Sequence, residues 1–166
     1  MASKSKIKGK AGERELSKIF KNVFGGSFIR VPSSGAFIGG KNKFRVSSLS
    51  ENQIRNSKGD IIPPDYMPNL VLECKFYSNF PFHLLLSGDD VPLLDSWIEQ
   101  TTEVLDKEDV WFLCWKINRK GWYITYEPNM YPDFILKHFN SYKKYIITDL
   151  KNFLVDNKSI ILKLSK

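Results

Sequence analysis

Cysteine and histidine are scarce in this chain, which has two of each among its 166 residues. A structural zinc site needs clustered ligands, yet His83 and His138 lie far apart and no cysteines stand near them at ligand spacing. Cys74 and Cys114 each lie in an apolar run typical of a buried strand, so we expect free core thiols and no disulfide. Any metal is therefore expected to be held by carboxylates.

Long apolar runs are also missing from the sequence. None approaches the roughly 20 residues that a membrane-spanning helix needs, and the N-terminal residues lack the apolar stretch of a secretory signal. We expect a cytoplasmic protein without a membrane partner, which leaves open a virus-encoded chain acting in a host cell. With 42% hydrophobic and 14% aromatic residues, one domain is expected, with a core over residues 8–126 and a C-terminal extension over 127–166.

Positive charge is abundant, with a formal net charge of +7. Lysines and arginines that neutralise phosphates supply sequence-independent affinity for nucleic acid. Two basic clusters lie close to the candidate site residues described below, and we predict that both contact DNA. They are Lys8, Lys10 and Arg14 in one cluster, and Lys41, Lys43 and Arg45 in the other.

Hydrophobic periodicity predicts an α/β fold. The expected elements, in order, are a helix over 10–24, strands over 27–31, 58–62 and 69–77, a helix over 90–106, and a hairpin of strands over 110–117 and 121–126. Residues 127–166 favour one or two short helices and strands near Tyr145 and Ile160, and the polar stretch 47–56 has no clear pattern. The order α-β-β-β-α-β predicts a mixed β-sheet flanked by helices.

Two charged residues interrupt the strand at 69–77, which is otherwise apolar on both faces. Glu73 and Lys75 are two positions apart, so they share one face while Cys74 lies on the other. Burying an unpaired charge is unfavourable by several kcal/mol or more, so the pair must be partnered or used. A salt bridge on an exposed edge strand and a catalytic pair both fit this pattern.

A second carboxylate, Asp60, opens the preceding strand directly after Gly59 and could meet Glu73 at one divalent cation. Mg²⁺ prefers oxygen ligands, commonly one or two carboxylates with water and phosphate oxygens. The ammonium of Lys75 suits the task of holding an attacking water or stabilising charge on phosphorus. Asp65 is a rival to Asp60, but the prolines around it indicate a turn, so Asp60 is favoured.

Glu13 adds a third carboxylate through helical phase. It lies three residues before Leu16 and seven before Phe20, at the rim of the predicted apolar stripe, whereas Glu15 points away. The alternative is a solvated glutamate near the start of the helix, where it complements the helix dipole.

Four motifs in order resemble those of the archaeal-type Holliday junction resolvases, a family of the PD-(D/E)XK nuclease superfamily. They are the stretch 9–16 with sequence GKAGEREL, the stretch 30–35 with sequence RVPSSG, Gly59-Asp60, and Glu73-Cys74-Lys75. The resemblance implies a restriction-endonuclease-like core and a hydrolase that cuts DNA phosphodiester bonds. It also implies Mg²⁺ dependence, with Mn²⁺ as a substitute, and a homodimer that nicks two strands of a four-way junction.

The resemblance also implies roles for single residues. Glu13, Asp60 and Glu73 would be metal ligands, and Lys75 the catalytic lysine. Further implied site residues are Ser34 near the scissile phosphate, Gln100 on the following helix, and Arg14 and Arg30 as phosphate contacts. The insertion at 37–56 is longer and more polar than expected in a minimal resolvase, and the region after 107 has no counterpart in the resemblance. Two alternatives therefore stay open: a nuclease of this superfamily with another DNA substrate, and a non-catalytic DNA-binding module of the same fold.

Overall fold

The computed structural model describes residues 4–31, 44–45 and 47–166, with side chains described from residue 7 onward. The helices are α1 (Lys4–Phe24), α2 (Glu51–Arg55), α3 (Phe82–Ser87), α4 (Pro92–Thr102), α5 (Leu150–Asp156) and α6 (Lys158–Leu164). The strands are β1 (Ile29–Arg30), β2 (Ile61–Ile62), β3 (Leu70–Tyr77), β4 (Val110–Ile117), β5 (Gly121–Tyr126), β6 (Phe139–Tyr142) and β7 (Tyr145–Asp149). A 3-10 turn, η2 (Pro128–Met130), lies between β5 and β6.

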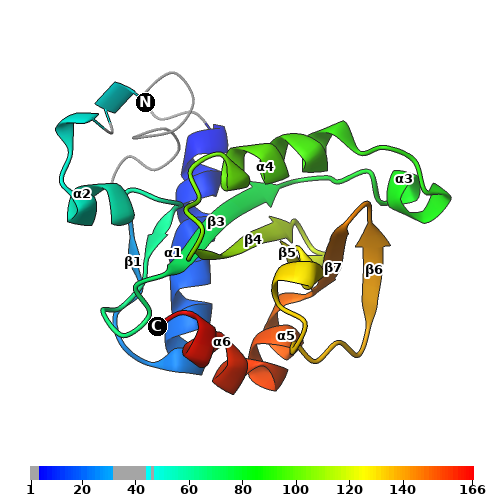
Figure 1. Ribbon diagram of the computed structural model, residues 1–166. Helices are drawn as coiled ribbons and strands as arrows, with labels where there is room; N and C mark the ends of the chain where they lie inside the picture. Colours follow the sequence, from blue (N-terminus) through cyan, green and yellow to red (C-terminus); the bar gives the residue numbers. More distant parts are fainter. Residues whose placement is uncertain (1–3, 32–43, 46) are drawn as a thin grey trace.

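The seven strands form one mixed sheet in the order β1-β2-β3-β4-β5-β7-β6 (Figure 1). β3 and β4 pair in parallel from Leu70↔Val110 to Tyr77↔Ile117, and the other neighbouring pairs are antiparallel. Parallel neighbours need a crossover connection, which here contains α3 and α4. The predicted fold class, a mixed sheet flanked by helices, is confirmed.

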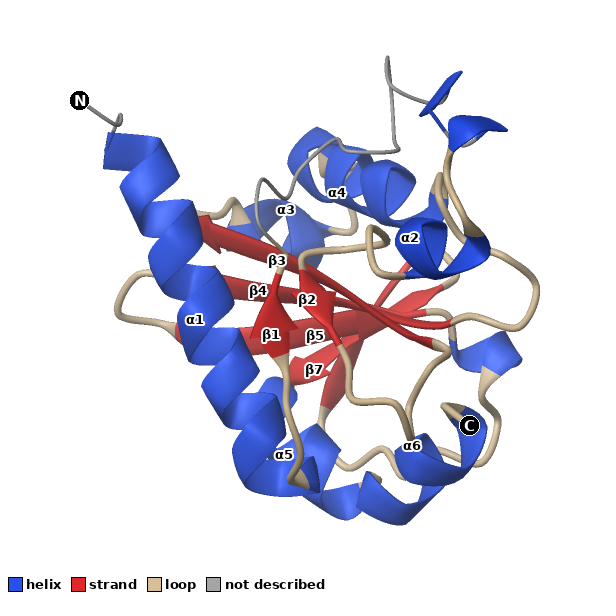
Figure 2. Ribbon diagram, turned by 90° about the vertical axis from the view of Figure 1, so that its left-hand side faces the viewer, coloured by secondary structure: helices blue, strands red, loops and turns tan. Residues whose placement is uncertain are grey.

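Side chains of β3 alternate between two hydrophobic cores, one on each face of the sheet. Leu70, Leu72 and Cys74 belong to the core that α1, α5 and α6 cover, whereas Val71 belongs to the core that α3 and α4 cover. Figure 2 shows α3 and α4 above the strands and α5 and α6 below them. Because side chains alternate along a strand, Glu73 shares the α4 face with Val71.

Helix α1 begins at residue 4, earlier than predicted, and ends where Gly25 and Gly26 adopt left-handed φ values of 76° and 71°. It lies close against β3 at Gly12, where an added Cβ would come within 2.9 Å of the Phe76 Cβ. Glycine at position 12 therefore permits α1 to approach β3 closely. That approach places the next residue, Glu13, against the sheet.

Several predicted boundaries differ from the structure. The strands expected at 27–31 and 58–62 shorten to β1 and β2, partly because Gly59 has a left-handed φ of 67° that no regular strand contains. The helix expected at 90–106 shortens to α4, and α3 was not predicted. The uncertain stretch 47–56 contains α2, which Ser50 and Gln53 begin with a reciprocal capping box.

The prediction of a strand near Ile160 is wrong, because this residue lies in α6. A short apolar run has the same composition in a strand and in a buried helix, so periodicity does not separate them. The strand expected near Tyr145 is confirmed as β7.

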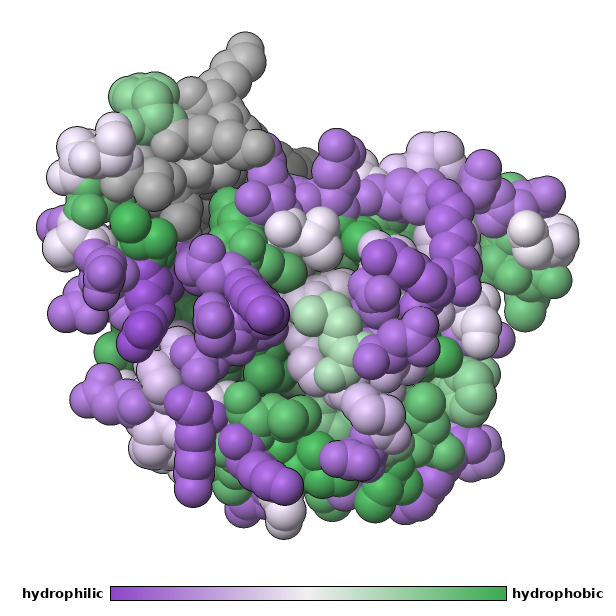
Figure 3. Space-filling model, in the orientation of Figure 1, coloured by the Kyte–Doolittle hydropathy of each residue, from purple (hydrophilic) through white to green (hydrophobic). Residues whose placement is uncertain are grey.

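The surface in Figure 3 is mostly hydrophilic, and hydrophobic residues gather in its lower part around α5 and α6. Exposed apolar side chains there include Val155 and Ile135. None of the helices in the described part of the chain is both long enough and apolar enough to span a membrane. Cys74 and Cys114 are buried free thiols, as predicted, and burial raises the pKa of both.

Candidate active site

Glu73 and Lys75 lie side by side on the α4 face of β3, and Gln100 of α4 completes a hydrogen-bonded triangle with them. The Lys75 Nζ donates to Glu73 Oε1 at 2.6 Å and to Gln100 Oε1 at 2.8 Å. Gln100 Nε2 donates to the same Glu73 oxygen at 3.0 Å. The predicted pair is therefore a buried salt bridge, and an amide from the facing helix holds it in place.

The charge state of Lys75 follows from its surroundings. Burial disfavours the ammonium, but the charge and hydrogen bond of Glu73 and the charge of Asp60 outweigh burial and raise the pKa of Lys75. Lys75 is therefore protonated at neutral pH. In that state it donates hydrogen bonds and stabilises negative charge, and it cannot act as a general base.

Asp60 lies opposite Glu73, where β2 pairs with β3. Its backbone N–H donates to the Leu72 carbonyl at 2.8 Å, and its own carbonyl accepts from the Val31 N–H at 2.9 Å. Its carboxylate Oδ2 accepts a hydrogen bond from the Cys74 backbone N–H at 2.8 Å. These contacts aim the Asp60 side chain, which is 4% exposed, across the β3 backbone.

Gly59 makes this placement possible. Its φ of 67° is left-handed, and a Cβ at this position would lie 2.5 Å from the Leu72 carbonyl oxygen. Any other residue would have to move the backbone away from β3. The Gly59-Asp60 motif is therefore explained by a tight approach of two strands that carries the aspartate into the sheet.

Asp60 is the most strongly perturbed carboxylate in the cluster. Burial, the charge of Glu73 and the charge of Glu13 raise its pKa to about 8, against the opposing effects of the Cys74 N–H and Lys75. Both glutamates therefore lie within electrostatic reach of Asp60. The three predicted carboxylates come from α1, β3 and the residue before β2, and both glutamates influence the charge state of Asp60.

Glu13 is buried at the edge of this cluster and forms an ion pair with Arg30 of β1. The Arg30 Nη1 donates to Glu13 Oε2 at 3.1 Å. The resemblance to the resolvases implied that Arg30 contacts phosphate and did not indicate this pairing. No local signal indicates it, because α1 and β1 meet only in the folded chain.

Glu15 points away from the cluster, in agreement with the helical phase. It accepts hydrogen bonds from the Lys116 Nζ at 2.7 Å and from the Trp122 indole N–H at 2.8 Å. Burial acts against ionisation, but these two donors lower the pKa of Glu15. Glu15 therefore anchors α1 to β4 and β5.

The structure places the other predicted residues as follows. Lys10 and Arg14 are exposed on α1, the Lys8 Nζ lies 4.7 Å from the Phe76 ring centre, and Arg45 lies over the Phe44 ring. Asp65 occupies an exposed turn. Ser34, Lys41 and Lys43 fall outside the described residues.

A second buried ion cluster lies next to the site, and the sequence analysis missed it. The Lys58 Nζ donates to Asp106 Oδ2 and to Asp109 Oδ2, each at 2.6 Å. Asp109 Oδ2 also accepts from the Asp106 backbone N–H at 2.6 Å. This cluster holds the residues before β2 against the loop before β4, two positions from Asp60.

The donor set suits a hard divalent cation, because all three candidate ligands are carboxylates. In the present arrangement Glu13 pairs with Arg30 and Glu73 with Lys75. In the part of the chain that the structure describes, no three His, Cys, Asp or Glu side chains are arranged to hold a metal ion. A cation here would have to compete with Arg30 and Lys75 for the carboxylate oxygens.

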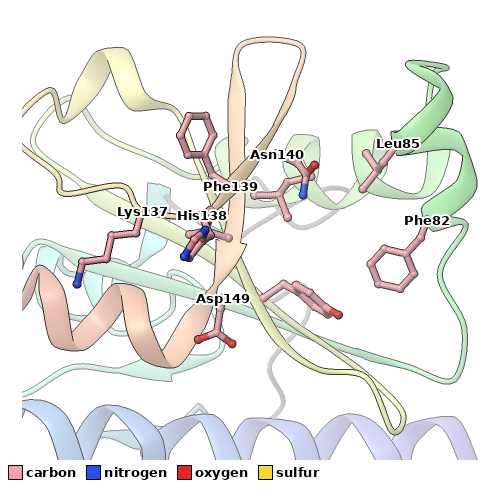
Figure 4. A pocket seen from close by; sticks show the side chains of 10 residues that line it. Phe82, Leu85, Lys137, His138, Phe139, Asn140 and Asp149 are labelled. Carbon is pink, nitrogen blue, oxygen red and sulfur yellow. The ribbon is translucent and has the colours of Figure 1, made fainter.

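A pocket of about 440 Å³ lies elsewhere, between α3 and the β6–β7 hairpin (Figure 4). Its walls include Phe82, Tyr123, His138, Asn140 and Asp149. It contains none of the candidate site residues. The candidate site residues therefore lie away from this pocket, in the buried carboxylate cluster at β2 and β3, next to the edge strand β1.

Comparison with known proteins identifies a family. The model of a family described as "phage putative PDDEXK endonuclease" matches residues 4–165, nearly the whole chain. No curated protein and no solved structure matches the sequence. The match supports the superfamily part of the resemblance and the restriction-endonuclease-like character of the sheet, but it does not extend to the archaeal resolvases. This chain therefore belongs to the phage family of PD-(D/E)XK endonucleases, and its activity class is that of a nuclease.

Proposed function

We propose that the protein is a metal-dependent endodeoxyribonuclease whose active site comprises Glu13, Asp60, Glu73 and Lys75. One observation carries this proposal: Asp60 is buried opposite Glu73 with a pKa raised to about 8. Burying this carboxylate beside two others disfavours its ionised form, and such perturbed carboxylates are typical of functional sites. The family match supports the nuclease class independently of this geometry.

Each residue in the site has a distinct task in phosphodiester hydrolysis. Glu13, Asp60 and Glu73 would hold Mg²⁺, or Mn²⁺ in its place. A bound cation of this kind polarises the scissile phosphate and lowers the pKa of a bound water. Lys75 stays protonated and stabilises negative charge as the phosphate is attacked.

Gln100 has a positioning task. Because its side chain contacts both Lys75 and Glu73, it keeps the ammonium in place when the Glu73 carboxylate turns toward a cation. Ser34, which lies outside the described residues, is proposed to contact the scissile phosphate by resemblance to the resolvases. The same resemblance implies that the cut strand carries a 5′ phosphate.

The proposed substrate is a four-way DNA junction, cut by two copies of the chain. This choice depends on the resemblance of four sequence motifs to the archaeal-type resolvases. Two nicks related by a twofold axis require two active sites, hence a homodimer. Lys8, Lys10, Arg14, Lys41, Lys43 and Arg45 are proposed to contact the DNA backbone, and Arg30 to contact phosphate when it leaves Glu13. An intracellular, virus-encoded enzyme fits the phage family.

A cleavage assay tests the proposal. Purified protein is incubated with a labelled four-way junction and with a linear duplex of the same sequence, in Mg²⁺ or in EDTA. We expect Mg²⁺-dependent nicking of the junction in preference to the duplex. Glu73→Ala is expected to abolish nicking, whereas Glu108→Ala, an exposed glutamate outside the cluster, is expected to retain it.

Each contrary result has its own meaning. Equal cutting of junction and duplex would contradict the resolvase assignment and leave a nuclease with another substrate. Nicking by Glu73→Ala at the wild-type rate would remove the proposed site. Tight DNA binding without cleavage in any metal would favour a non-catalytic binding module.

A further inference from the structure

The exposed side of α1 carries a line of positive charges that the proposed active site does not use. Lys10, Arg14, Lys18 and Lys21 are all exposed, and their spacings of four, four and three residues place them on one face of the helix. We call these four residues the α1 stripe. Lys18 and Lys21 had no role in the sequence analysis.

The α1 stripe is not neutralised from within the protein. The two acidic residues of α1 turn inward, Glu13 to Arg30 and Glu15 to Lys116, and the first turn of the helix has no acidic residue. Within the described ranges, no ion pair or side-chain hydrogen bond involves any of the four stripe residues. By contrast, Lys58, Lys75, Lys137, Lys143 and Lys144 each pair with a carboxylate.

Such an arrangement is unfavourable for an isolated helix. Like charges three or four residues apart repel by a few tenths of a kcal/mol per pair, and surface helices usually alternate the sign of such neighbours. The α1 stripe contains three like-charged neighbour pairs in succession. A polyanion lying along the helix would convert this repulsion into attraction.

The dimensions of the α1 stripe match the backbone of a duplex. From Lys10 to Lys21 the helix rises about 16 Å, at about 1.5 Å per residue. One strand of B-DNA presents a phosphate about every 3.4 Å along the axis, so about five phosphates lie within that length. Four cations along this line can therefore contact successive phosphates of one strand.

The position of α1 links the stripe to the site. Figure 2 looks onto the sheet edge formed by β1 and β2, and α1 runs along the same side of the molecule. Glu13 lies on this helix between Lys10 and Arg14 but faces inward to the carboxylate cluster. A DNA strand that passes the carboxylate cluster would therefore lie close to the N-terminal end of the α1 stripe.

We infer that the α1 stripe is the binding track for the backbone of one duplex arm of the DNA substrate. This inference rests on the proposed function, because it takes DNA as the substrate. It assigns Lys18 and Lys21 to DNA binding and predicts that the enzyme holds duplex beyond the scissile phosphate, in the direction of the C-terminal end of α1. The contacts are to phosphates, so the track supplies affinity without sequence preference.

The test compares two triple variants that each remove three positive charges. The stripe variant carries Arg14→Gln, Lys18→Gln and Lys21→Gln. The control variant carries Lys158→Gln, Lys163→Gln and Lys166→Gln, which are exposed lysines at the C-terminal end, where α6 lies. Binding to a labelled four-way junction and to a linear duplex is measured by fluorescence anisotropy in EDTA over a range of salt concentrations.

We expect the stripe variant to bind at least about tenfold more weakly at physiological salt. The slope of log affinity against log salt should fall by about 2.7, which is about 0.9 for each lost phosphate contact. The control variant should keep the wild-type slope. Circular dichroism should show no loss of melting temperature in either variant, because all six side chains are exposed, and the stripe variant should melt at the same or a slightly higher temperature because repulsion is relieved.

A stripe variant that keeps the wild-type slope of log affinity against log salt would overturn the inference. An equal loss of slope in both would also overturn it, because binding would then depend on net charge and not on the track. Binding is measured in EDTA and cleavage is measured separately in Mg²⁺, so the two proposals can fail independently. A protein that binds DNA through the α1 stripe but does not cut it would contradict the proposed function and not this inference. Metal-dependent cleavage by the wild type, together with a stripe variant that keeps the wild-type salt slope, would contradict this inference and not the proposed function.

Discussion

Two clusters of buried charge lie two residues apart at the start of β2, and they balance their charges differently. In the first, the ammonium of Lys58 is 6% exposed and is bound by both Asp106 and Asp109 at 2.6 Å. Burial disfavours that ammonium, but the two aspartates outweigh burial and raise the pKa of Lys58. Every charge in this cluster has its partner inside the protein.

The second cluster, at Asp60, is not balanced in this way. No lysine or arginine in the described ranges donates a hydrogen bond to its carboxylate, which accepts the backbone N–H of Cys74. Burial beside Glu73 and Glu13 raises the pKa of Asp60 to about 8. The difference separates two arrangements of buried charge: the charges of the Lys58 cluster are paired within the protein, whereas Asp60 has the surroundings expected of the proposed cation ligand.

The largest expected effect is on cleavage by Asp60→Asn. We expect the rate of DNA cleavage in Mg²⁺ to fall by about 1000-fold, which is the upper end of the loss seen when one charge-stabilising group is removed. Stability in EDTA at pH 8 should stay the same or increase, because the amide removes a buried charge. Cleavage assays and urea unfolding measure the two quantities. Asp65→Asn, on an exposed turn, should change neither, and full activity of Asp60→Asn would contradict a catalytic role.

The next effect concerns stability and the other cluster. Lys58→Met should lower the free energy of unfolding by about 3–5 kcal/mol, because it leaves the Asp109 carboxylate buried without a cation. Asp106→Ala is the matched control. Its carboxylate lies equally close to Lys58 but is 70% exposed, so its loss should cost about 1 kcal/mol or less. Equal losses in urea denaturation would show that distance, and not burial, sets the strength of this cluster.

The smallest effect, when taken per pH unit, is a pH dependence of stability in EDTA. The pKa of Asp60 is raised to about 8 in the folded protein, whereas an unfolded aspartate titrates near about 3.9. The folded state therefore binds more protons between these values, and stability should fall as pH rises from about 4 to about 8. The slope from this group is at most about 1.4 kcal/mol per pH unit. Urea unfolding at several pH values should show this decline in wild-type protein.

Asp60→Asn should remove the part of this decline that Asp60 causes, while Lys58→Met should keep it. Parallel curves for wild type and Asp60→Asn would contradict the raised pKa.

Local patterns in the sequence were sufficient for much of the site. The period of two in β3 predicted that Glu73 and Lys75 share a face, and helical phase separated Glu13 from Glu15. Gly59 before Asp60 indicated a special backbone position, which the structure explains by a carbonyl too close for any Cβ. These features depend on neighbours along the chain, so the sequence contains them directly.

The partners of the charged residues were not predictable in this way. Arg30 pairs with Glu13 across 17 residues, and Lys58 pairs with Asp109 across 51. A strand was predicted near Ile160 because a short apolar run does not distinguish a strand from a buried helix. Packing against the core decides between the two, and Ile160 packs there as part of α6.

The sequence by itself therefore indicated the side chains that we propose carry the chemistry, because charges within apolar periodic segments stand out locally. It also determined the fold class, through the order and period of its elements. Only the tertiary structure decided which charges are neutralised, because strand pairing and helix packing choose partners that are distant along the chain. That choice distinguishes the Lys58 cluster, whose charges are paired within the protein, from Asp60, whose carboxylate accepts the Cys74 N–H but no hydrogen bond from a described lysine or arginine. It also places the α1 stripe in solvent, with no ion pair among the described residues.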